Sequence, residues 1–426
     1  MVRWADERTD GDDSFGGTGR VRRCGRPMTV LSPAERAIVA AIDPAPLLEQ
    51  TRRWASRNSG TGNLAGLAAI AADLAEVCAS LPGAVALVPA EPVERIGRDG
   101  LPASVGHGDH LVVRVRPDAE RRVLLTGHMD TVYAADDPFQ ACRLDGDRLQ
   151  GPGTADMKGG LAIMLAGLAA FEAGGPALGY DVLVNSDEET GSLSSARLIA
   201  ELARDKVAAL TFEPALAGGL AARARPGSGN LALVVRGRSA HAGRDPGAGR
   251  NALVAAADLA LRLAALAGSG LSVNPARIDG GGPNNRVPDL AILHVNLRPR
   301  SADDEARAQA GIAALVGDVA AAREVTVAVH GGFARPAKPI TAAAEHLFAR
   351  VARASSDLGT PLDWVDTGGV CDGNNIAAAG VPVIDTMGAI GGAIHSPDEW
   401  LSVAGLAERA RLTALVLHRL DREVGP

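Results

Sequence analysis

Five separate stretches of the sequence end an apolar run with a histidine or a carboxylic acid. Open α/β sheets bind their ligands beyond the carboxyl ends of their strands, so we expect these side chains to meet at one sheet edge. Any one of them alone is more simply explained as a turn or helix-capping residue. Together they predict one functional site, whose candidate residues are His128, Asp130, Asp156, Glu188, Glu189, Glu213 and His395.

Metal binding is the chemistry that this set of side chains favours. Clustered carboxylates repel one another and lose hydration, so they need a cation to offset both costs. A mixture of histidine and carboxylate without cysteine suits Zn²⁺, with Mn²⁺ or Co²⁺ as alternatives. Five ligands suffice for two ions if one carboxylate is shared, and each ion then keeps an open position for water. One further acid remains to accept a proton from that water.

The stretch "NSDEETGS" at residues 185–192 carries three adjacent acids. Neighbouring side chains in a strand point to opposite faces, so the backbone must leave regular β geometry if Glu188 and Glu189 are to face one site. Alternatively, the acids stabilise the positive end of the helix expected in "SLSSARLIAEL". For Asp187 we expect a capping or surface position.

The segments that position these residues alternate between strand and helix patterns. This rhythm predicts an α/β sheet covered by helices on both faces. The expected strands are residues 110–117, 121–130, 180–186, 207–214 and 381–388. The expected helices are residues 44–57, 64–81, 160–174, 343–359, 373–380 and 402–423.

A different pattern begins near Pro226. Residues 229–331 read as strand, helix, two strands, helix and strand, which is the order of the split βαβ, or ferredoxin-like, sandwich. The α/β rhythm returns after Arg335, so the smaller unit is inserted into the larger one. We therefore expect a lid or dimerisation domain at 226–335 and a discontinuous catalytic domain at 28–225 and 336–426.

The composition narrows the choice of partners and compartment. Residues 1–27 are polar and glycine-rich without an apolar signal core, and we expect a disordered extension there, with Met28 as a candidate true start. A net charge of −7 without a long basic run argues against a nucleic-acid partner. Four dispersed cysteines fit a reduced, cytoplasmic protein, and charges or glycines break every stretch long enough to span a membrane.

Several motifs occur together in the order typical of one family. They are "GHMDTV", "GPGTADMKGG", "SDEETGS", "FEP", "GRSAHAGRDPGAGRNA" and "GGAIHSPDE". The chain resembles the di-zinc metallopeptidases and deacylases that include glutamate carboxypeptidase, acetylornithine deacetylase and succinyl-diaminopimelate desuccinylase. This resemblance covers roughly residues 40–420. It implies a zinc-peptidase-like catalytic domain with a mixed sheet, an inserted ferredoxin-like lid, and a homodimer formed through that lid.

The resemblance also implies a role for each matching residue. It assigns His128 and Glu213 to one metal, Glu189 and His395 to the other, and Asp156 to both, with a cis bond between Asp156 and Met157. It makes Glu188 the general base, Asp130 the acid that orients His128, and His241 the lid residue that polarises the scissile carbonyl. It assigns substrate binding to Asn285, Arg298, Arg335, Gly368 and Gly369.

The implied reaction is metal-assisted hydrolysis of an amide bond next to a free carboxylate. N-acyl-amino-acid deacylase and dipeptidase are alternatives that share this mechanism, and an inactive binding homologue is a remote one. A di-metal phosphoesterase would need a basic phosphate cradle, which the sequence lacks. The loop "TGGVCDGNN" departs from the "GGGTDA" or "SGGTDA" of relatives after Gly369, so the resemblance does not fix the substrate.

Overall fold

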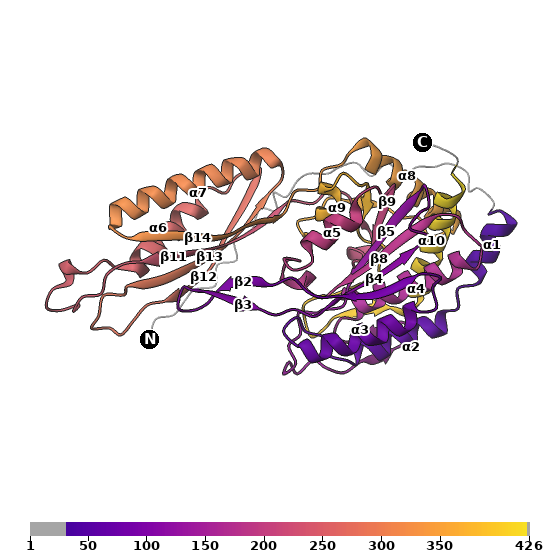
Figure 1. The fold of residues 1–426 in the computed structure, drawn as a ribbon, viewed down its shortest axis with the longest axis horizontal. Coiled ribbons are helices and arrows are strands. Elements are labelled where there is room, and N and C mark those ends of the chain that lie inside the picture. The colour runs from indigo at the N-terminus through magenta and orange to yellow at the C-terminus, as the bar shows by residue number, and fades with distance from the viewer. Residues whose placement is uncertain (1–30, 424–426) are drawn as a thin grey trace, which may run out of the picture.

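The computed structural model describes residues 31–423. The expected extension at 1–27 and the alternative start at Met28 lie outside these residues. The described part forms two units side by side, shown in Figure 1 with the catalytic unit on the right and the lid on the left.

A six-stranded mixed sheet forms the centre of the catalytic unit, in the order β1-β4-β8-β5-β9-β16. Strands β8, β5, β9 and β16 run parallel to one another, whereas β4 is antiparallel to both of its neighbours. Their bounds are Ala84–Val88 (β1), His110–Val115 (β4), Arg122–His128 (β5), Gly179–Asn185 (β8), Ala208–Thr211 (β9) and Val383–Ile384 (β16).

Helices cover both faces of this sheet, as the sequence predicts. Alternate residues of a strand point to opposite faces: Leu125 of β5 packs into the larger core with α2, α3, α4 and α10, whereas Leu124 packs against α5 and α9. The helices are α1 (Pro33–Ala40), α2 (Pro44–Ala55), α3 (Leu64–Cys78), α4 (Gly159–Glu172), α5 (Ala196–Ala203), α8 (Ala342–Asp357), α9 (Asp372–Ala378) and α10 (Val403–Arg422).

Helix α4 is almost entirely apolar, and most of its residues are buried. Together with the preceding turn it forms the one stretch of the described residues, Thr154–Glu172, that is long and apolar enough to cross a membrane. Since 89% of this stretch is buried inside the protein, it is explained as a core helix.

The lid has the predicted β-α-β-β-α-β order and an antiparallel sheet arranged β12-β13-β11-β14. Helices α6 and α7 cover one face, where Leu233 and Leu293 are fully buried in a core separate from that of the catalytic unit. The elements are β11 (Ser228–Arg236), α6 (Ala252–Ala264), β12 (Leu271–Gly280), β13 (Leu290–Pro299), α7 (Ala302–Arg323) and β14 (Thr326–Arg335).

The two chain segments that connect the units lie side by side. The backbones of Arg225 and Lys338 pair through two hydrogen bonds of 3.1 and 2.9 Å, and both side chains form ion pairs with the buried Asp385. The side-chain amide of Asn374 donates to the carbonyl oxygens of Pro226 and Pro336, at 2.8 and 2.7 Å. Both connections are therefore anchored to the catalytic unit at the same place.

A hairpin that the sequence analysis did not predict forms a further bridge between the units. Strands β2 (Val93–Ile96) and β3 (Pro102–Val105) extend from the catalytic unit toward the lid (Figure 1). At the tip, the carbonyl oxygen of Gly100 accepts a 3.1 Å hydrogen bond from Arg236 in β11. Arg95 in β2 donates to the carbonyl oxygen of Thr190, at 3.0 Å, and so connects the hairpin with the acidic stretch.

Short elements complete the catalytic unit. A small sheet has the order β17-β18-β7-β6, and β10 pairs with β15. The bounds are Arg143–Asp145 (β6), Arg148–Gln150 (β7), Ala221–Ala222 (β10), Trp364–Val365 (β15), Gly391–Gly392 (β17) and Trp400–Ser402 (β18). Single helical turns occur at Thr154–Lys158 (η1), Glu188–Thr190 (η2), Ala217–Gly219 (η3) and Pro246–Ala248 (η4).

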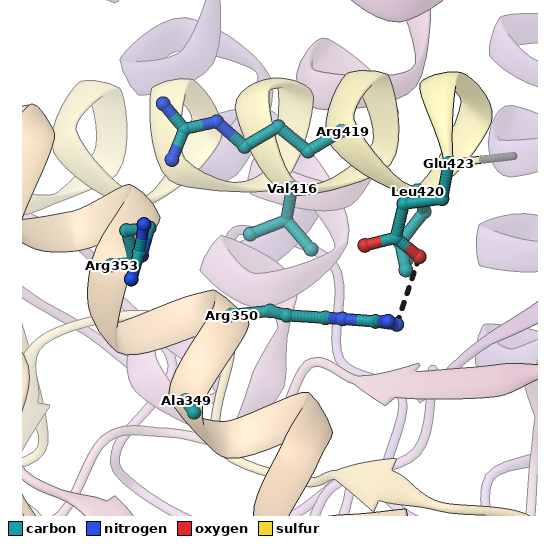
Figure 2. A pocket seen from close by; sticks show the side chains of 7 residues that line it. All are labelled: Ala349, Arg350, Arg353, Val416, Arg419, Leu420 and Glu423. Atoms are coloured by element: carbon teal, nitrogen blue, oxygen red, sulfur yellow. Dashed lines mark ion pairs between the residues drawn. The ribbon is translucent and has the colours of Figure 1, made fainter. Parts of the chain in front are cut away.

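A pocket of about 290 Å³ lies between α8 and α10, and Figure 2 shows its lining. A 2.9 Å ion pair between Arg350 and Glu423 closes one side. None of the predicted site residues lines this pocket; its lining residues are Ala349, Arg350, Arg353, Val416, Arg419, Leu420 and Glu423.

Candidate metal centre and active site

The predicted ligands gather at one edge of the central sheet. His128 ends β5, Glu188 and Glu189 follow β8, and Glu213 follows β9. These three strands are parallel neighbours, so their carboxyl ends open onto the same edge, as expected for an α/β sheet. Asp156 reaches this edge from the turn before α4, and His395 reaches it from the segment between β17 and β18.

Asp156 occupies the centre of the cluster. Its Oδ1 lies 3.1 Å from Nε2 of His128, and its Oδ2 lies 3.2 Å from Nε2 of His395. Each carboxylate oxygen thus faces a different histidine, which is the arrangement that a carboxylate shared between two ions requires. The peptide bond between Asp156 and Met157 is cis, as the resemblance implied.

The remaining acids divide between the two histidines. Oε2 of Glu189 lies 3.3 Å from Nε2 of His395, and Oε1 of Glu213 lies 3.9 Å from Nε2 of His128. Ligand atoms of His128, Asp156 and Glu189 lie within 4.8 Å of one another, as do those of His128, Glu188 and Glu213. These two overlapping groups contain four of the five predicted ligands and the predicted base, Glu188. The fifth predicted ligand, His395, adjoins them through its contacts with Asp156 and Glu189.

The electrostatics of the cluster suit the binding of a cation. Burial raises the pKa of Glu188 to about 8 and also raises the pKa values of Glu189 and Glu213. One carboxylate oxygen of Glu189 and one of Glu213 are buried without a hydrogen-bond partner among residues 31–423. Hydrogen bonds to Asp156 and Glu189 raise the pKa of His395 to about 10. Buried acids with unsatisfied oxygens next to histidines are the donor set that a divalent metal ion satisfies.

The backbone of the acidic stretch leaves β geometry where the sequence predicts. Glu188–Thr190 form a single 3₁₀ turn, and Gly191 follows in the left-handed region with φ of 101°. The turn directs both adjacent acids to the same cluster. Of the two positions expected for Asp187, the surface one is wrong, because the residue is fully buried, whereas its contacts agree with the capping one. Its carboxylate instead accepts bonds from the backbone N–H groups of Ser194 and Ser195, at 2.7 and 3.2 Å, just before α5.

Asp130 holds this turn against the end of β5. Its carboxylate is fully buried and accepts hydrogen bonds of 3.2 Å from the backbone N–H groups of both Glu188 and Glu189. Thr61 donates a third hydrogen bond to it, at 2.8 Å. Nδ1 of His128 lies 3.0 Å from its backbone oxygen and 3.4 Å from its carboxylate. Asp130 thus contacts His128, the predicted ligand, and also fixes the two acids.

Arg335, at the end of lid strand β14, reaches into the cluster. Its Nη2 donates to the Glu188 carboxylate at 2.7 Å and lies 3.4 Å from the Asp372 carboxylate. Its pKa is raised above the usual range, because these two acids outweigh the effect of burial, which lowers it. Asp372 begins α9, within the stretch that departs from the family pattern, and its other partners are Asn185 and Ser192. Arg335 is therefore engaged with two acids of the protein itself.

Comparisons with known proteins agree with this geometry. A sequence profile described as Peptidase family M20/M25/M40 matches residues 124–419. The chain belongs to this family. It is 32% identical over 324 residues to carboxypeptidase G2 of Pseudomonas sp. (strain RS-16), a match covering 73% of this chain and 76% of the relative. It is 30% identical over 324 residues to succinyl-diaminopimelate desuccinylase of Xanthomonas euvesicatoria pv. vesicatoria (strain 85-10), covering 70% and 83%.

Solved structures share the fold across both units. The M20 family metallo-carboxypeptidase Sso-CP2 from Sulfolobus solfataricus superposes with a TM-score of 0.70 at 15% identity, covering 87% of this chain and 98% of that one. A tripeptidase from Staphylococcus aureus gives 0.70 at 22% identity, covering 90% and 100%. As a member of the M20/M25/M40 family, the chain is a metallohydrolase that cleaves amide bonds.

The remaining predicted site residues of this M20-family chain lie around the lid and its junction. Arg298 of β13 is half-buried and donates to the carbonyl oxygen of Gly368 at 3.1 Å, so it and the Gly368–Gly369 loop are neighbours. His241 and Asn285 belong to adjoining lid segments, where Ala242 N–H donates to the Asn285 carbonyl oxygen at 2.9 Å. Neither hydrogen-bonds to a predicted ligand among residues 31–423.

A second pocket opens beside Glu189. Its volume is about 490 Å³, and Glu189 is the one acidic or basic residue in its lining. The other lining residues are small or neutral: Gly60, Thr61, Gly62, Asn63, Thr131, Val132, Ala134, Ala135 and Thr190. Sequence reasoning missed this wall of the site, because the stretch "SGTGN" carries no residue that would attract attention as a ligand.

Proposed function

We propose that the chain hydrolyses an amide bond adjacent to a free carboxylate, in the manner of a glutamate carboxypeptidase, with two Zn²⁺ ions per chain. The observation that carries this proposal is the different environment of two adjacent acids. Glu189 faces His395 and Asp156, whereas Glu188 faces Arg335 and keeps a carboxylate within reach of the other group. Adjacent carboxylates with different partners suit one ligand and one general base.

The contacts around Asp156 and His128 support the proposed ligands. His128 and Glu213 would hold one ion, Glu189 and His395 the other, and Asp156 would contact both. When bound, the ions would supply a water of lowered pKa and polarise the scissile carbonyl. Co²⁺ and Mn²⁺ suit the same donors.

Glu188 performs the proton transfers in this proposal. Its carboxylate accepts the proton of the attacking water and later donates it to the leaving amine, while Arg335 fixes its orientation. His241, carried by the lid, donates a hydrogen bond to the developing oxyanion when it is brought to the site by lid closure or by a partner subunit.

The substrate in this proposal lies between the pocket beside Glu189 and the junction of the lid with the catalytic unit. Arg298, beside the Gly368–Gly369 loop, receives the free carboxylate, since a guanidinium pairs with both carboxylate oxygens. Asn285 and Arg335 are further candidates for this end. The pocket beside Glu189 receives the group on the other side of the bond.

The first experiment is the Glu188→Gln variant, which keeps the side-chain shape and an oxygen that accepts from Arg335. We expect two metal ions per chain and a loss of kcat by at least 10²-fold. Retained kcat would contradict the role of Glu188. Wild-type protein that holds clearly fewer than two ions after metal loading would contradict the two-metal site.

The second experiment separates the substrate classes. Glutamate amides, N-acyl amino acids and dipeptides are tested with Zn²⁺, Co²⁺ and Mn²⁺ supplied in turn. Preference for a C-terminal glutamate supports a carboxypeptidase activity. Preference for N-acetyl or N-succinyl amino acids makes the chain a deacylase, and preference for unblocked dipeptides makes it a dipeptidase.

We also propose a homodimer formed through the lid. The outer surface of α6 leaves three large apolar side chains exposed, namely Leu253 (39%), Val254 (45%) and Leu261 (75%). Spaced along one helix, they form a stripe that a second copy would cover. Light scattering should give a dimer mass for the wild type and a smaller mass for Leu261→Asp. A monomeric wild type with full activity contradicts both the dimer and a role for His241 in a partner's site.

A further inference from the structure

A buried carboxylate outside the proposed ligand set supports the turn that carries Asp156. Glu399 lies four residues after His395 and is fully buried. Its Oε1 accepts the backbone N–H groups of Ala155 and Asp156, at 2.9 and 3.0 Å. Its Oε2 accepts the backbone N–H of Gly153 at 3.2 Å and the hydroxyl of Tyr133 at 2.7 Å. In the sequence, "SPDEW" looks like an ordinary turn.

These four donors converge on one side chain from a tight turn and a neighbouring segment. Gly153 has φ of 71°, which places it in the left-handed region that glycine tolerates, and the chain then folds around the Glu399 carboxylate. The backbone oxygen of Glu399 also accepts the N–H of Gly151, at 3.1 Å. One residue thus fixes the whole segment that ends at Asp156.

The geometry points to Glu399 as a positioning residue for Asp156, the ligand shared by both ions. The hydrogen bond to the Asp156 N–H fixes the backbone from which its carboxylate projects between His128 and His395. Because Glu399 follows His395 closely, it also ties the segments of two ligands together. This inference rests on the proposed two-metal function and goes beyond it, since Glu399 contacts no predicted ligand atom.

Glu399→Gln is the informative substitution. Glutamine keeps the volume but offers one acceptor oxygen instead of two, so at least one backbone N–H of the turn faces an NH₂ group. Tyr133→Phe is the matched control. It removes one hydrogen-bond donor to Glu399 but leaves both Glu399 oxygens available to the backbone N–H groups of the turn. Both proteins are loaded with Zn²⁺, and their affinities are measured by competition with a chromogenic chelator.

Outer residues that orient metal ligands typically change metal affinity 10- to 100-fold. We expect Glu399→Gln to weaken at least one Zn²⁺ by that factor, and Tyr133→Phe by less than about threefold. The visible spectrum of the Co²⁺-loaded protein should also change in Glu399→Gln and not in Tyr133→Phe. A residue with a purely structural role would lower the melting temperature of metal-free protein and leave both readouts unchanged.

The outcomes separate this inference from the proposed function. If the wild type binds two ions and Glu399→Gln binds them equally tightly with an unchanged Co²⁺ spectrum, the inference is overturned and the function stands. If Glu399→Gln does not fold, Glu399→Asp is measured in its place; it keeps the charge but shortens the reach, and wild-type affinity in that protein likewise overturns the inference.

Discussion

Replacing Arg335 by methionine distinguishes two roles for this residue. The family resemblance assigns it to a substrate carboxylate, whereas the structure pairs it with Glu188 and Asp372. Its side chain is only 7% exposed, and those of Glu188 and Asp372 are 9% and 4% exposed. Methionine keeps much of the length and apolar contact of the arginine but leaves Asp372, and Glu188 whenever it is ionised, buried without a cation.

The expected cost follows from burial. Removing one partner of a buried ion pair costs about 3–5 kcal/mol, because the remaining charge is uncompensated. Arg298→Met is the matched control: Arg298 is half-buried and donates to neutral oxygens of Gly368 and Asn296, so we expect a cost of about 1 kcal/mol. A double variant that adds Asp372→Asn should recover at least about 1 kcal/mol of the Arg335→Met loss, as coupled neighbours do.

Urea unfolding of metal-free protein measures these costs. Metal-free protein is used because a metal ion bound to the folded state would raise the apparent free energy of unfolding. Steady-state kinetics of metal-loaded protein then separate kcat from KM. Pairing with Glu188 predicts a lower kcat for Arg335→Met, because the base loses its fixed orientation. If Arg335→Met is as stable as Arg298→Met, with a raised KM and an unchanged kcat, Arg335 serves the substrate and the pairing argument is wrong.

Three further variants test other parts of the structure. Asp130→Asn replaces one acceptor oxygen by a donor beside two N–H groups, and should weaken Zn²⁺ binding 10- to 100-fold in chelator competition, against a smaller effect for Thr61→Val; equal affinities would refute this. Burial raises the pKa of Glu399 to about 7 from an ordinary value of 4.5, so its contribution to stability is complete below about pH 4.5 and lost as the pH rises through 7. The melting temperature of metal-free wild type should therefore fall, relative to that of Glu399→Gln, as the pH rises over this range. If the two melting temperatures change in parallel with pH, the raised pKa of Glu399 is disproved. Arg409 is 2% exposed, burial lowers its pKa to about 10, and its guanidinium donates to the carbonyl oxygen of Gly219 while two of its nitrogens lack partners among the described residues. Arg409→Met should unfold at an equal or higher urea concentration, and a marked drop would show that the charge is compensated.

The sequence predicted the sheet, the lid and the ligand cluster because their signals are local. His128 ends an apolar strand, and helix α6 of the lid keeps a clear amphipathic period. The hairpin β2–β3 was missed because its short strands are largely exposed and show no apolar alternation. Glu399 was missed because its partners lie 243–266 residues away along the chain, so nothing near it in the sequence marks it.

Asp187 shows the same limit on a smaller scale. The sequence left two positions open for Asp187, one capping a helix and one on the surface, where like charges repel less. The structure instead buries Asp187 against the N–H groups of Ser194 and Ser195, which become available only because the chain turns at Gly191. Burial of a polar residue depends on which donors the fold supplies, and the local sequence does not contain that information.

Because the two connections to the lid pair with each other at Arg225 and Lys338, the lid is an insertion that could be exchanged as a whole. Residues that face each other in an antiparallel pair have Cα atoms about 5 Å apart, so a two-residue turn can join them without moving the catalytic sheet. Lids of different size or surface could thus replace one another during evolution, or be grafted by design, at this pair of connections. Such an exchange has to preserve Arg335, because this residue belongs to the lid and yet binds Glu188.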